Sequence, residues 1–308
     1  FLKWGLDGIL IATCFGNLIG LASGLIRYRS RIKFEFDILK LKKMLRFSLP
    51  LVPSGMAVFI HGYIDRMMIN HYLTLNEVGL YGMGFRIAAI TSIILAGFNR
   101  SLSPLIISNY RNPNTPSQIA KIFRYFIGIS LLFFMFLSLF AKEILILLTT
   151  PKFYESSFIV IYLVPAILFS QMYMFAPGTS IAKKTHLIMI ISFSGAVINV
   201  ILNFIFIPHF GYEGAALATL IANFILFTIK MSVSQKFYRI PFEWIRISIP
   251  CIITVIIIVI VLKLEYGIFY TLIIKAFVLV MLPIVLVITA GISLTFPIAI
   301  TKFLELRG

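Results

Sequence analysis

Charged side chains occur in this sequence inside segments that are otherwise apolar. Asp65, Arg66, Arg86 and Lys275 each lie within such a segment, and His61 lies four residues before Asp65. A charge in the hydrocarbon of a bilayer costs from about 2.5 kcal/mol upward, so each of these residues needs a partner or a function. The chemistry that they offer is anion binding by the cations and proton transfer by His61 and Asp65.

Enzyme motifs are missing from the sequence. It has no zinc-ligand spacing, nucleophile–base arrangement, glycine-rich phosphate loop or pair of catalytic carboxylates, and only 11 acidic residues. We therefore expect no enzyme, no metal and no cofactor. Cys14 and Cys251 both lie in apolar segments, which argues against a disulfide framework.

The segment around Asp65 permits several pairings. Asp65 and Arg86 lie at similar distances from a short connection at 73–77, so one interpretation is an ion pair that neutralises both. His61 and Asp65 share a helical face. A hydrogen bond inside a helix bundle and a couple that carries protons for ion-driven transport are the two interpretations of that spacing.

Arg66 is left without a partner if Asp65 pairs with Arg86. Either its long stem extends to the outer membrane interface, or its guanidinium lies in a water-filled cavity and binds an anionic head group or diphosphate. Lys275 in the last apolar segment has the same two interpretations. Four amides also lie in apolar segments: Gln171, Asn199, Asn203 and Asn223. Hydrogen bonding between helices and lining of a cavity are the alternatives for them.

The composition identifies a membrane protein. Of the 308 residues, 60% are hydrophobic and 12% charged, and the mean hydropathy is +1.02. Soluble proteins carry about 25% charged residues, so a soluble enzyme and a disordered chain are excluded. A span needs roughly 20 apolar residues and must be helical in lipid unless it belongs to a closed barrel. Nine segments are of about this length: 5–26, 47–72, 78–99, 123–148, 157–179, 187–207, 213–234, 247–263 and 267–296. We therefore expect an all-α polytopic membrane protein of about nine transmembrane helices.

Basic residues indicate the orientation. They gather in alternate connections, namely 27–46, 111–124, 183–184, 230–246 and 302–307. The intervening connections hold only Lys3, Lys142, Lys152 and Lys263. The positive-inside rule then predicts a cytoplasmic C-terminus and an external Phe1. The net charge of +16 is thereby explained by topology, and a nucleic-acid partner is not expected.

The beginning of the chain carries no predicted signal peptide, because no basic segment and cleavage site follow Phe1. An odd number of spans with an external start indicates the C-terminal part of a longer protein. The basic segment 27–46 offers contacts to anionic lipid or to a cytoplasmic biosynthetic partner, although positive-inside anchoring suffices to explain it.

Several short motifs resemble those of a known family. They are Leu45-Arg46-Phe47-Ser48-Leu49-Pro50-Leu51-Val52-Pro53-Ser54, Asp65-Arg66, Glu77-Val78-Gly79-Leu80-Tyr81, Arg86-Ile87-Ala88 and Gly211-Tyr212-Glu213-Gly214-Ala215-Ala216-Leu217-Ala218-Thr219. In this order and spacing they are similar to the O-antigen and polysaccharide flippases of the multidrug/oligosaccharidyl-lipid/polysaccharide exporter superfamily. The first span of this chain would be the family's sixth, and its last span the fourteenth.

This resemblance implies a fold like that of the MATE transporters, in which two six-helix bundles face a central cavity. The chain would hold the last helix of the N-terminal bundle at 1–26 and a basic cytoplasmic linker at 27–46. The complete C-terminal six-helix bundle would occupy 47–234. Two additional helices and a short cytoplasmic tail would follow at 235–308.

The resemblance also implies a function. Such a flippase moves an undecaprenyl-diphosphate-linked oligosaccharide, an O-antigen or exopolysaccharide repeat unit, from the cytoplasmic to the outer leaflet of the bacterial inner membrane by alternating access. Arg66 and Arg86 match positions at which the family carries cavity charge, and with Lys275 they are the expected substrate-binding residues. The implied partners are the lipid-linked oligosaccharide and the phospholipid bilayer, with a polysaccharide polymerase and other assembly proteins as further candidates.

Other functions remain open on the sequence. A cation-coupled multidrug exporter and a peptidoglycan-precursor flippase share the implied fold, and a membrane scaffold that does not transport is a different class. An exporter would favour buried carboxylates, whereas this chain carries more buried basic than acidic charge. Without the first five helices of the family the chain holds half a cavity, so we do not expect it to transport alone.

Overall fold

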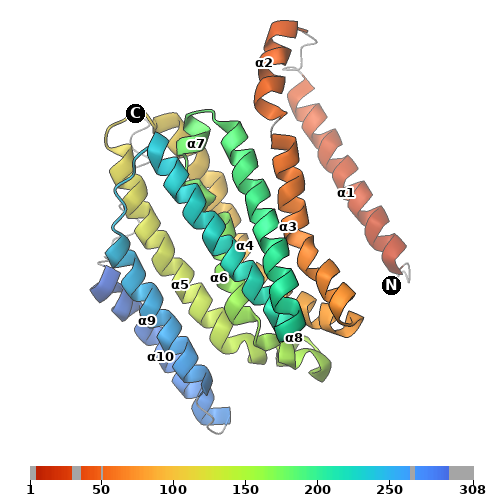
Figure 1. Ribbon diagram of the computed structural model, residues 1–308, viewed down its shortest axis with the longest axis vertical. Coiled ribbons are helices and arrows are strands. Elements are labelled where there is room, and N and C mark those ends of the chain that lie inside the picture. The colour runs from red at the N-terminus through yellow and green to blue at the C-terminus, as the bar shows by residue number, and fades with distance from the viewer. Residues whose placement is uncertain (1–4, 30–35, 50, 264–267, 291–308) are drawn as a thin grey trace. The chain divides into compact units, whose positions relative to one another are not determined.

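The computed structural model describes residues 5–29, 36–49, 51–263 and 268–290, and no strand occurs among them (Figure 1). The all-helical fold predicted from the sequence is therefore confirmed. The chain divides into two compact units, residues 1–46 and 47–308.

Unit 1 consists of α1 (Gly5–Tyr28) and most of α2 (Ile38–Ser48). The described side chains of α1 are almost all exposed, and nothing lies within 4 Å of the positions that a Cβ would take on Gly16, Gly20 and Gly24. The α2 helix begins after Asp37, whose carboxylate accepts the backbone N–H of Leu39 at 2.9 Å. Part of the basic segment at 27–46 is thus a helix.

Unit 2 begins with three long helices that run back and forth: α3 (Leu51–Tyr72), α4 (Leu75–Asn109) and α5 (Thr115–Leu148). Thr74 caps α4, and the backbone N–H of Thr74 donates to the Glu77 carboxylate at 3.2 Å. A short η2 (Pro151–Ser157) leads to α6 (Val160–Gln171), which continues through η3 (Met172–Phe175) into α7 (Gly178–Ile181).

The next helix, α8 (Thr185–Phe237), is two helices folded back on each other. At Gly211 the backbone leaves the helical region, with φ of 61° and ψ of −145°. Across this break the Nδ2 of Asn199 lies 3.5 Å from the Oγ1 of Thr219. A Cβ on Gly195 would approach Leu226 to 2.8 Å. The two halves are therefore antiparallel and in contact.

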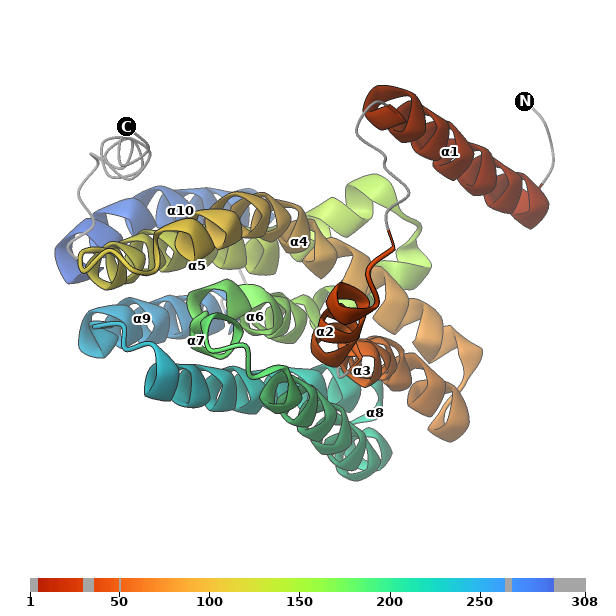
Figure 2. The same cartoon turned by 90° about the horizontal axis from the view of Figure 1, so that it is seen from above.

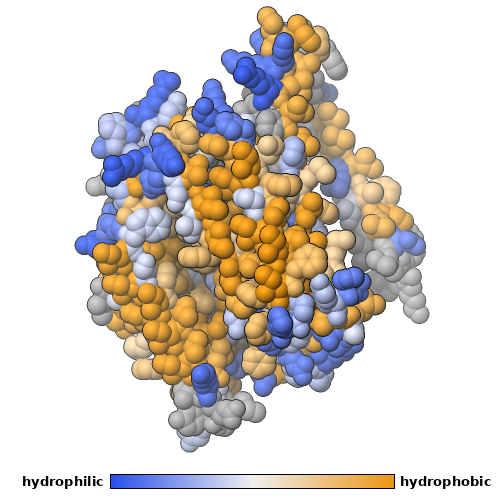
Figure 3. All heavy atoms as spheres, in the orientation of Figure 1, coloured by the Kyte–Doolittle hydropathy of each residue, from blue (hydrophilic) through white to orange (hydrophobic). Residues whose placement is uncertain are grey.

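This break accounts for the number of spans. By length and hydropathy seven helices of the described residues can cross a membrane, or eight when α3 is counted together with α2. Counting the two halves of α8 separately gives nine, and each matches a segment predicted from the sequence. On the face drawn in Figure 3, apolar side chains cover the middle of unit 2 and polar side chains lie toward its ends.

The last two helices, α9 (Trp244–Lys263) and α10 (Ile268–Ala290), contact each other and α5. Figure 2 shows them at the edge of unit 2 that lies away from α3. Their contacts with α5 include two charged clusters, one near each end of α5. Helices α3 to α8 pack on one another, and α9 and α10 pack on α5.

We predict that Gly211→Ala destabilises the protein, because the positive φ at Gly211 is strained for a residue with a Cβ, at a cost of about 1–3 kcal/mol. The thermal unfolding midpoint in detergent should fall. The matched control is Gly97→Ala, since Gly97 lies in the helical part of α4 with open space at its Cβ position. Equal midpoints for the two variants would contradict this account of the α8 break.

Candidate functional site

The carboxylate of Asp65 is the centre of a polar cluster inside the bundle. Asp65 lies on α3 and is only 3% exposed. Its Oδ2 accepts hydrogen bonds from the Tyr81 hydroxyl on α4 at 2.7 Å and from the Thr219 hydroxyl at 2.8 Å. Its Oδ1 accepts from the Nδ2 of Asn203 at 2.8 Å. The donors come from α4 and from both halves of α8, so the cluster joins four helical segments.

The two turns of the bundle position these side chains. Asp65 and Tyr81 each lie eight residues from Leu73, at the turn between α3 and α4. Asn203 and Thr219 each lie eight residues from Gly211, at the break in α8. In each hairpin, equal distances from the turn place two residues at one depth. Small residues at the start of the second half of α8 are buried and permit close helix packing: Gly214, Ala215, Ala216 and Ala218.

The Asp65 cluster has an unbalanced charge. Of the ion pairs among the described residues, none includes Asp65. The side-chain oxygens of Asn199 and Asn203 are buried near it and have no hydrogen-bond partner among the described residues. The Thr219 hydroxyl also lies 2.9 Å from the carbonyl oxygen of Ala215, so its single proton can go to either acceptor. The cluster therefore gathers oxygen atoms around a buried carboxylate.

A buried carboxylate that accepts hydrogen bonds only from neutral donors can bind a proton or a cation, either of which would neutralise its charge. Oxygen ligands of this kind suit hard cations. Transition metals are usually bound by several His, Cys, Asp or Glu side chains. The described ranges contain no group of three or more such side chains that could hold a metal ion. The cluster has the chemistry of an exchangeable proton or hard-cation site.

His61 lies one turn from Asp65 on α3 and bonds to a different residue of α8. Its Nε2 is 2.9 Å from the Oδ1 of Asn223, and its Nδ1 is buried without a hydrogen-bond partner. His61 and Asp65, for which a proton-carrying couple was one interpretation, thus share a face of α3. Each of them bonds to different residues of α8. Their joint role in coupling stays a prediction.

The ion pair between Asp65 and Arg86 is absent from the structure. The connection turns at Leu73 and Thr74, so Tyr81 lies opposite Asp65 and Arg86 is five residues deeper along α4. Those five residues also turn Arg86 about 140° around the helix from Tyr81. Arg86 is exposed, and its Nη1 lies 3.6 Å from the Met83 sulfur.

Arg66 lies next to the cluster and stacks on aromatic rings. Its guanidinium carbon is 4.7 Å from the centre of the Phe85 ring and 5.7 Å from that of Tyr63. The side chain is half-buried, and the ion pairs of the described residues do not involve it. A stacked guanidinium keeps its edge free for forked hydrogen bonds to an anion.

Lys275 belongs to another part of the unit. Its side chain is 7% exposed, and its Nζ lies 2.6 Å from the Oε1 of Glu143, in the contact between α10 and α5. The structure therefore groups Arg66 with Asp65 on α3, and places Lys275 with a counterion on other helices. A role of Lys275 in substrate binding stays a prediction.

Sequence reasoning missed Tyr81, Thr219 and Glu143. Tyr81 was noted as part of a family motif, and it is fully buried against Asp65. Tyr81 and Asp65 are equally far from the turn, and this spacing is the sequence signal that could have predicted their contact. Asn199, Asn203 and Asn223 do form the hydrogen bonds between helical segments that their positions suggested.

We predict that Glu143→Gln destabilises the protein more than Lys275→Met, because Glu143→Gln leaves the more deeply buried charge of Lys275 without a partner. Breaking a buried pair costs about 3–5 kcal/mol, and the 32% exposure of Glu143 makes the lower end of that range the expected value. The double variant should recover much of the loss. Thermal unfolding midpoints of the three variants test this, and strictly additive losses would contradict a direct pair.

The chain resembles proteins of glycan assembly and transport. The sequence profile of the family described as polysaccharide biosynthesis protein matches residues 1–157. A curated relative of Haloferax volcanii, named "Probable low-salt glycan biosynthesis flippase Agl15", is 24% identical over 251 residues. That match covers 79% of this chain and 53% of the relative, so the chain spans about half the length of that protein.

Two solved structures have the same fold. The lipid II flippase MurJ, in an inward closed conformation, matches 92% of this chain and 63% of its own with a TM-score of 0.63 and 17% identity. The MATE transporter VcmN of Vibrio cholerae, in its bent form, matches 78% of this chain and 52% of its own with a TM-score of 0.53 and 17% identity. The predicted MATE-like fold is thereby confirmed. With a profile match over half of its length, the chain belongs to the polysaccharide biosynthesis protein family.

Proposed function

We propose that this chain is part of a flippase that moves an undecaprenyl-diphosphate-linked oligosaccharide, an O-antigen or exopolysaccharide repeat unit, from the cytoplasmic to the outer leaflet by alternating access. Membership of the polysaccharide biosynthesis family supports the glycan substrate. The observation that carries the proposal is that Asp65, a buried carboxylate, is followed on α3 by Arg66, whose stacked guanidinium forms no ion pair within the described residues.

The proposal includes the domain organisation of the chain. We infer that residues 1–26 are the last helix of an N-terminal bundle, 27–46 a basic linker, 47–234 the C-terminal bundle, and 235–308 two additional helices with a short tail. The basic connections support a cytoplasmic C-terminus in a bacterial inner membrane. A polysaccharide polymerase and other assembly proteins are the partners expected of such a flippase.

Arg66 is the residue that we assign to the anionic part of the substrate. Stacking on Phe85 and Tyr63 fixes the plane of the guanidinium, while its edge can form two parallel hydrogen bonds to phosphate oxygens. Arg86 is exposed on the neighbouring helix and is the second candidate for the diphosphate or for acidic sugars. A scaffold that does not transport would have no use for this arrangement.

Asp65 is the residue that we assign to coupling. A bound proton or cation would cancel its charge and tighten the contact of α3 with both halves of α8, whereas release would leave a buried charge that favours another arrangement. This gives an ion gradient a means to bias alternating access. His61, held one turn away, is the neighbouring group through which a proton could reach Asp65.

A peptidoglycan-precursor flippase of the same fold is the second candidate function. The likeness to MurJ over 92% of the chain favours it, and its substrate would offer Arg66 the same diphosphate chemistry. The Asp65 cluster serves both candidates equally. The glycan attached to the diphosphate is what separates them.

We predict that Arg66→Ala abolishes transport in cells whose only flippase is the complete protein. Lipid-linked glycan should accumulate on the cytoplasmic face, and Arg66→Lys should restore transport only in part because an ammonium lacks the planar fork. Leaflet location of the lipid-linked glycan at equal protein level is the measurement. Lys152→Ala, an exposed cation of η2, is the matched control. Wild-type transport by Arg66→Ala would refute the assigned role.

We predict that a monovalent cation or a proton stabilises the protein through Asp65, since a ligand that binds only the folded state raises its stability. Thermal midpoints are compared in sodium, potassium and choline salts and across a pH series. Asp65→Asn keeps the size of the side chain and should remove the response. A wild-type protein that responds to neither cation nor pH would contradict the coupling site, as would an unchanged response in Asp65→Asn.

A further inference from the structure

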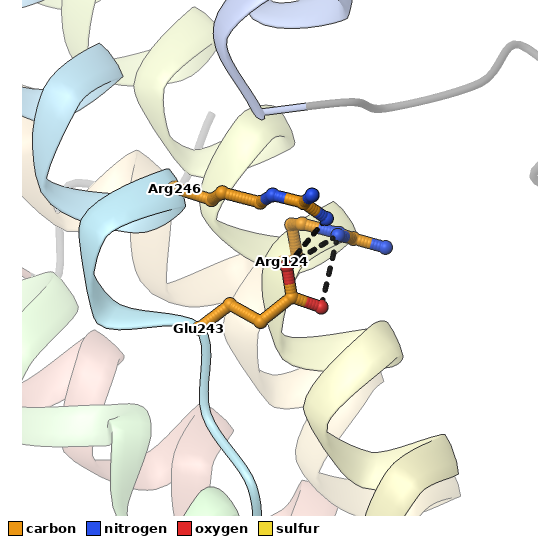
Figure 4. A network of polar contacts seen from close by, with 3 residues as sticks. All are labelled: Arg124, Glu243 and Arg246. Carbon is orange, nitrogen blue, oxygen red and sulfur yellow. Dashed lines mark hydrogen bonds and ion pairs between the residues drawn. The ribbon is translucent and has the colours of Figure 1, made fainter.

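A second charged cluster of unit 2 joins α5 to the start of α9. The Nη1 of Arg124 on α5 lies 3.2 Å from the Oε2 of Glu243, and the Nη1 of Arg246 on α9 lies 2.6 Å from the same oxygen. Figure 4 shows the two guanidinium groups converging on the one carboxylate. The cluster shares no residue with the Asp65 site.

The charges of this cluster do not balance. Two guanidinium groups share one carboxylate, which leaves one positive charge. The flanking segments add to the excess, because 121–124 and 239–246 also contain Lys121 and Arg239 and no second acidic residue. A single Arg124–Glu243 pair would suffice to fasten α9 to α5. Arg246 therefore keeps a positive charge that an anion can neutralise.

The position of the cluster is that of lipid head groups. Arg124 lies at the start of the apolar part of α5, and Arg246 directly precedes the apolar part of α9. Trp244 lies two residues before Arg246 in the chain. Its ring is partly exposed and lies 5.3 Å from that of Phe242. Tryptophan gathers at the level of the head groups. Phe242 and Trp244 precede Arg246, whereas the apolar part of α9 follows it, so these rings lie at the head-group end of α9.

Hydrogen-bond donors remain for a ligand. Each guanidinium has five N–H donors, and the bonds to Glu243 are made by the Nη1 atoms alone. The Arg246 side chain is 59% exposed, whereas that of Arg124 is 15% exposed. A phosphate oxygen can therefore reach Arg246 from the bilayer surface, with Arg124 reinforcing the positive field behind it.

We propose that Arg124, Glu243 and Arg246 form a binding site for the phosphate of an anionic phospholipid. Arg246 binds the phosphate directly, Glu243 holds the two guanidinium groups side by side, and Trp244 lies against the adjoining acyl chain. The site would fasten the start of α9 to the bilayer surface. It is independent of the transported substrate and of the proposed flippase function.

Quenching of Trp244 fluorescence tests this site directly. The full-length protein, with every tryptophan except Trp244 replaced by phenylalanine, is reconstituted into bilayers that contain phosphatidylglycerol or phosphatidylcholine with brominated acyl chains. Bromine quenches a tryptophan that it touches, so the two lipids report their relative occupancy beside Trp244. We expect the anionic lipid to be preferred about fivefold, as for one added basic contact at an anionic surface.

Variants separate the site from general surface charge. Arg246→Gln should bring the preference close to one, and its exposure makes the substitution tolerable to the fold. Arg246→Lys should keep part of the preference, and Glu243→Gln should keep or raise it because a competing carboxylate is removed. Lys152→Gln is the matched control with an exposed cation elsewhere and should keep the full preference.

Three results would overturn the proposal. Equal quenching by the two brominated lipids in the otherwise unchanged protein would exclude a preference for anionic lipid. An unchanged preference in Arg246→Gln would place the lipid elsewhere. Loss of the preference on adding millimolar inorganic phosphate, at constant ionic strength, would identify a soluble anion as the ligand in place of the lipid.

Discussion

A buried carboxylate that is held only by neutral donors is the constraint on which the bundle depends. Asp65 is enclosed by Tyr81, Asn203 and Thr219, which come from the helices that two turns bring together. Hydrogen bonds alone leave its negative charge uncompensated in an apolar surrounding. The same turns that shape α4 and α8 therefore also bring together the groups that we propose to bind a proton or cation. Arg66, the next residue of α3, is positioned by the packing of α3 on α8 together with the rings of Phe85 and Tyr63.

The charged contacts of α5 attach the last two helices, α9 and α10, to α5. Arg124 and Glu143 are 19 residues apart on α5, a rise of roughly 28 Å that is close to the thickness of the hydrocarbon. Near one end of this length α5 holds Glu243 at the start of α9, and near the other it holds Lys275 of α10. The additional helices are thus fastened near both ends of one helix of the bundle, on residues that the Asp65 cluster does not use. A movement of α3 against α8 can occur without breaking these contacts.

Hydropathy and length were sufficient to predict the helices, because a bilayer demands long apolar segments with internally bonded backbones. Even the break at Gly211 was anticipated, since 187–207 and 213–234 were separate segments. One interpretation of Asp65, an ion pair with Arg86, was wrong, because the turn lies about two residues earlier than expected and a different residue of α4 is therefore opposite Asp65. The contact of Lys275 with Glu143 joins residues 132 positions apart, and helix periodicity carries no information on such a pairing. The orientation in the membrane and the roles of Arg66, Arg86 and Lys275 stay predictions.

The most direct test is transport of a lipid-diphosphate oligosaccharide by the complete protein in liposomes, under an imposed proton or sodium gradient. Glycan that reaches the far leaflet is detected with a membrane-impermeant lectin. We predict that the gradient drives transport in the wild-type protein and that Asp65→Asn, which keeps the shape of the side chain without its charge, reduces transport to the level seen without a gradient. Gradient-driven transport at the wild-type rate in Asp65→Asn would contradict the central role given to this carboxylate.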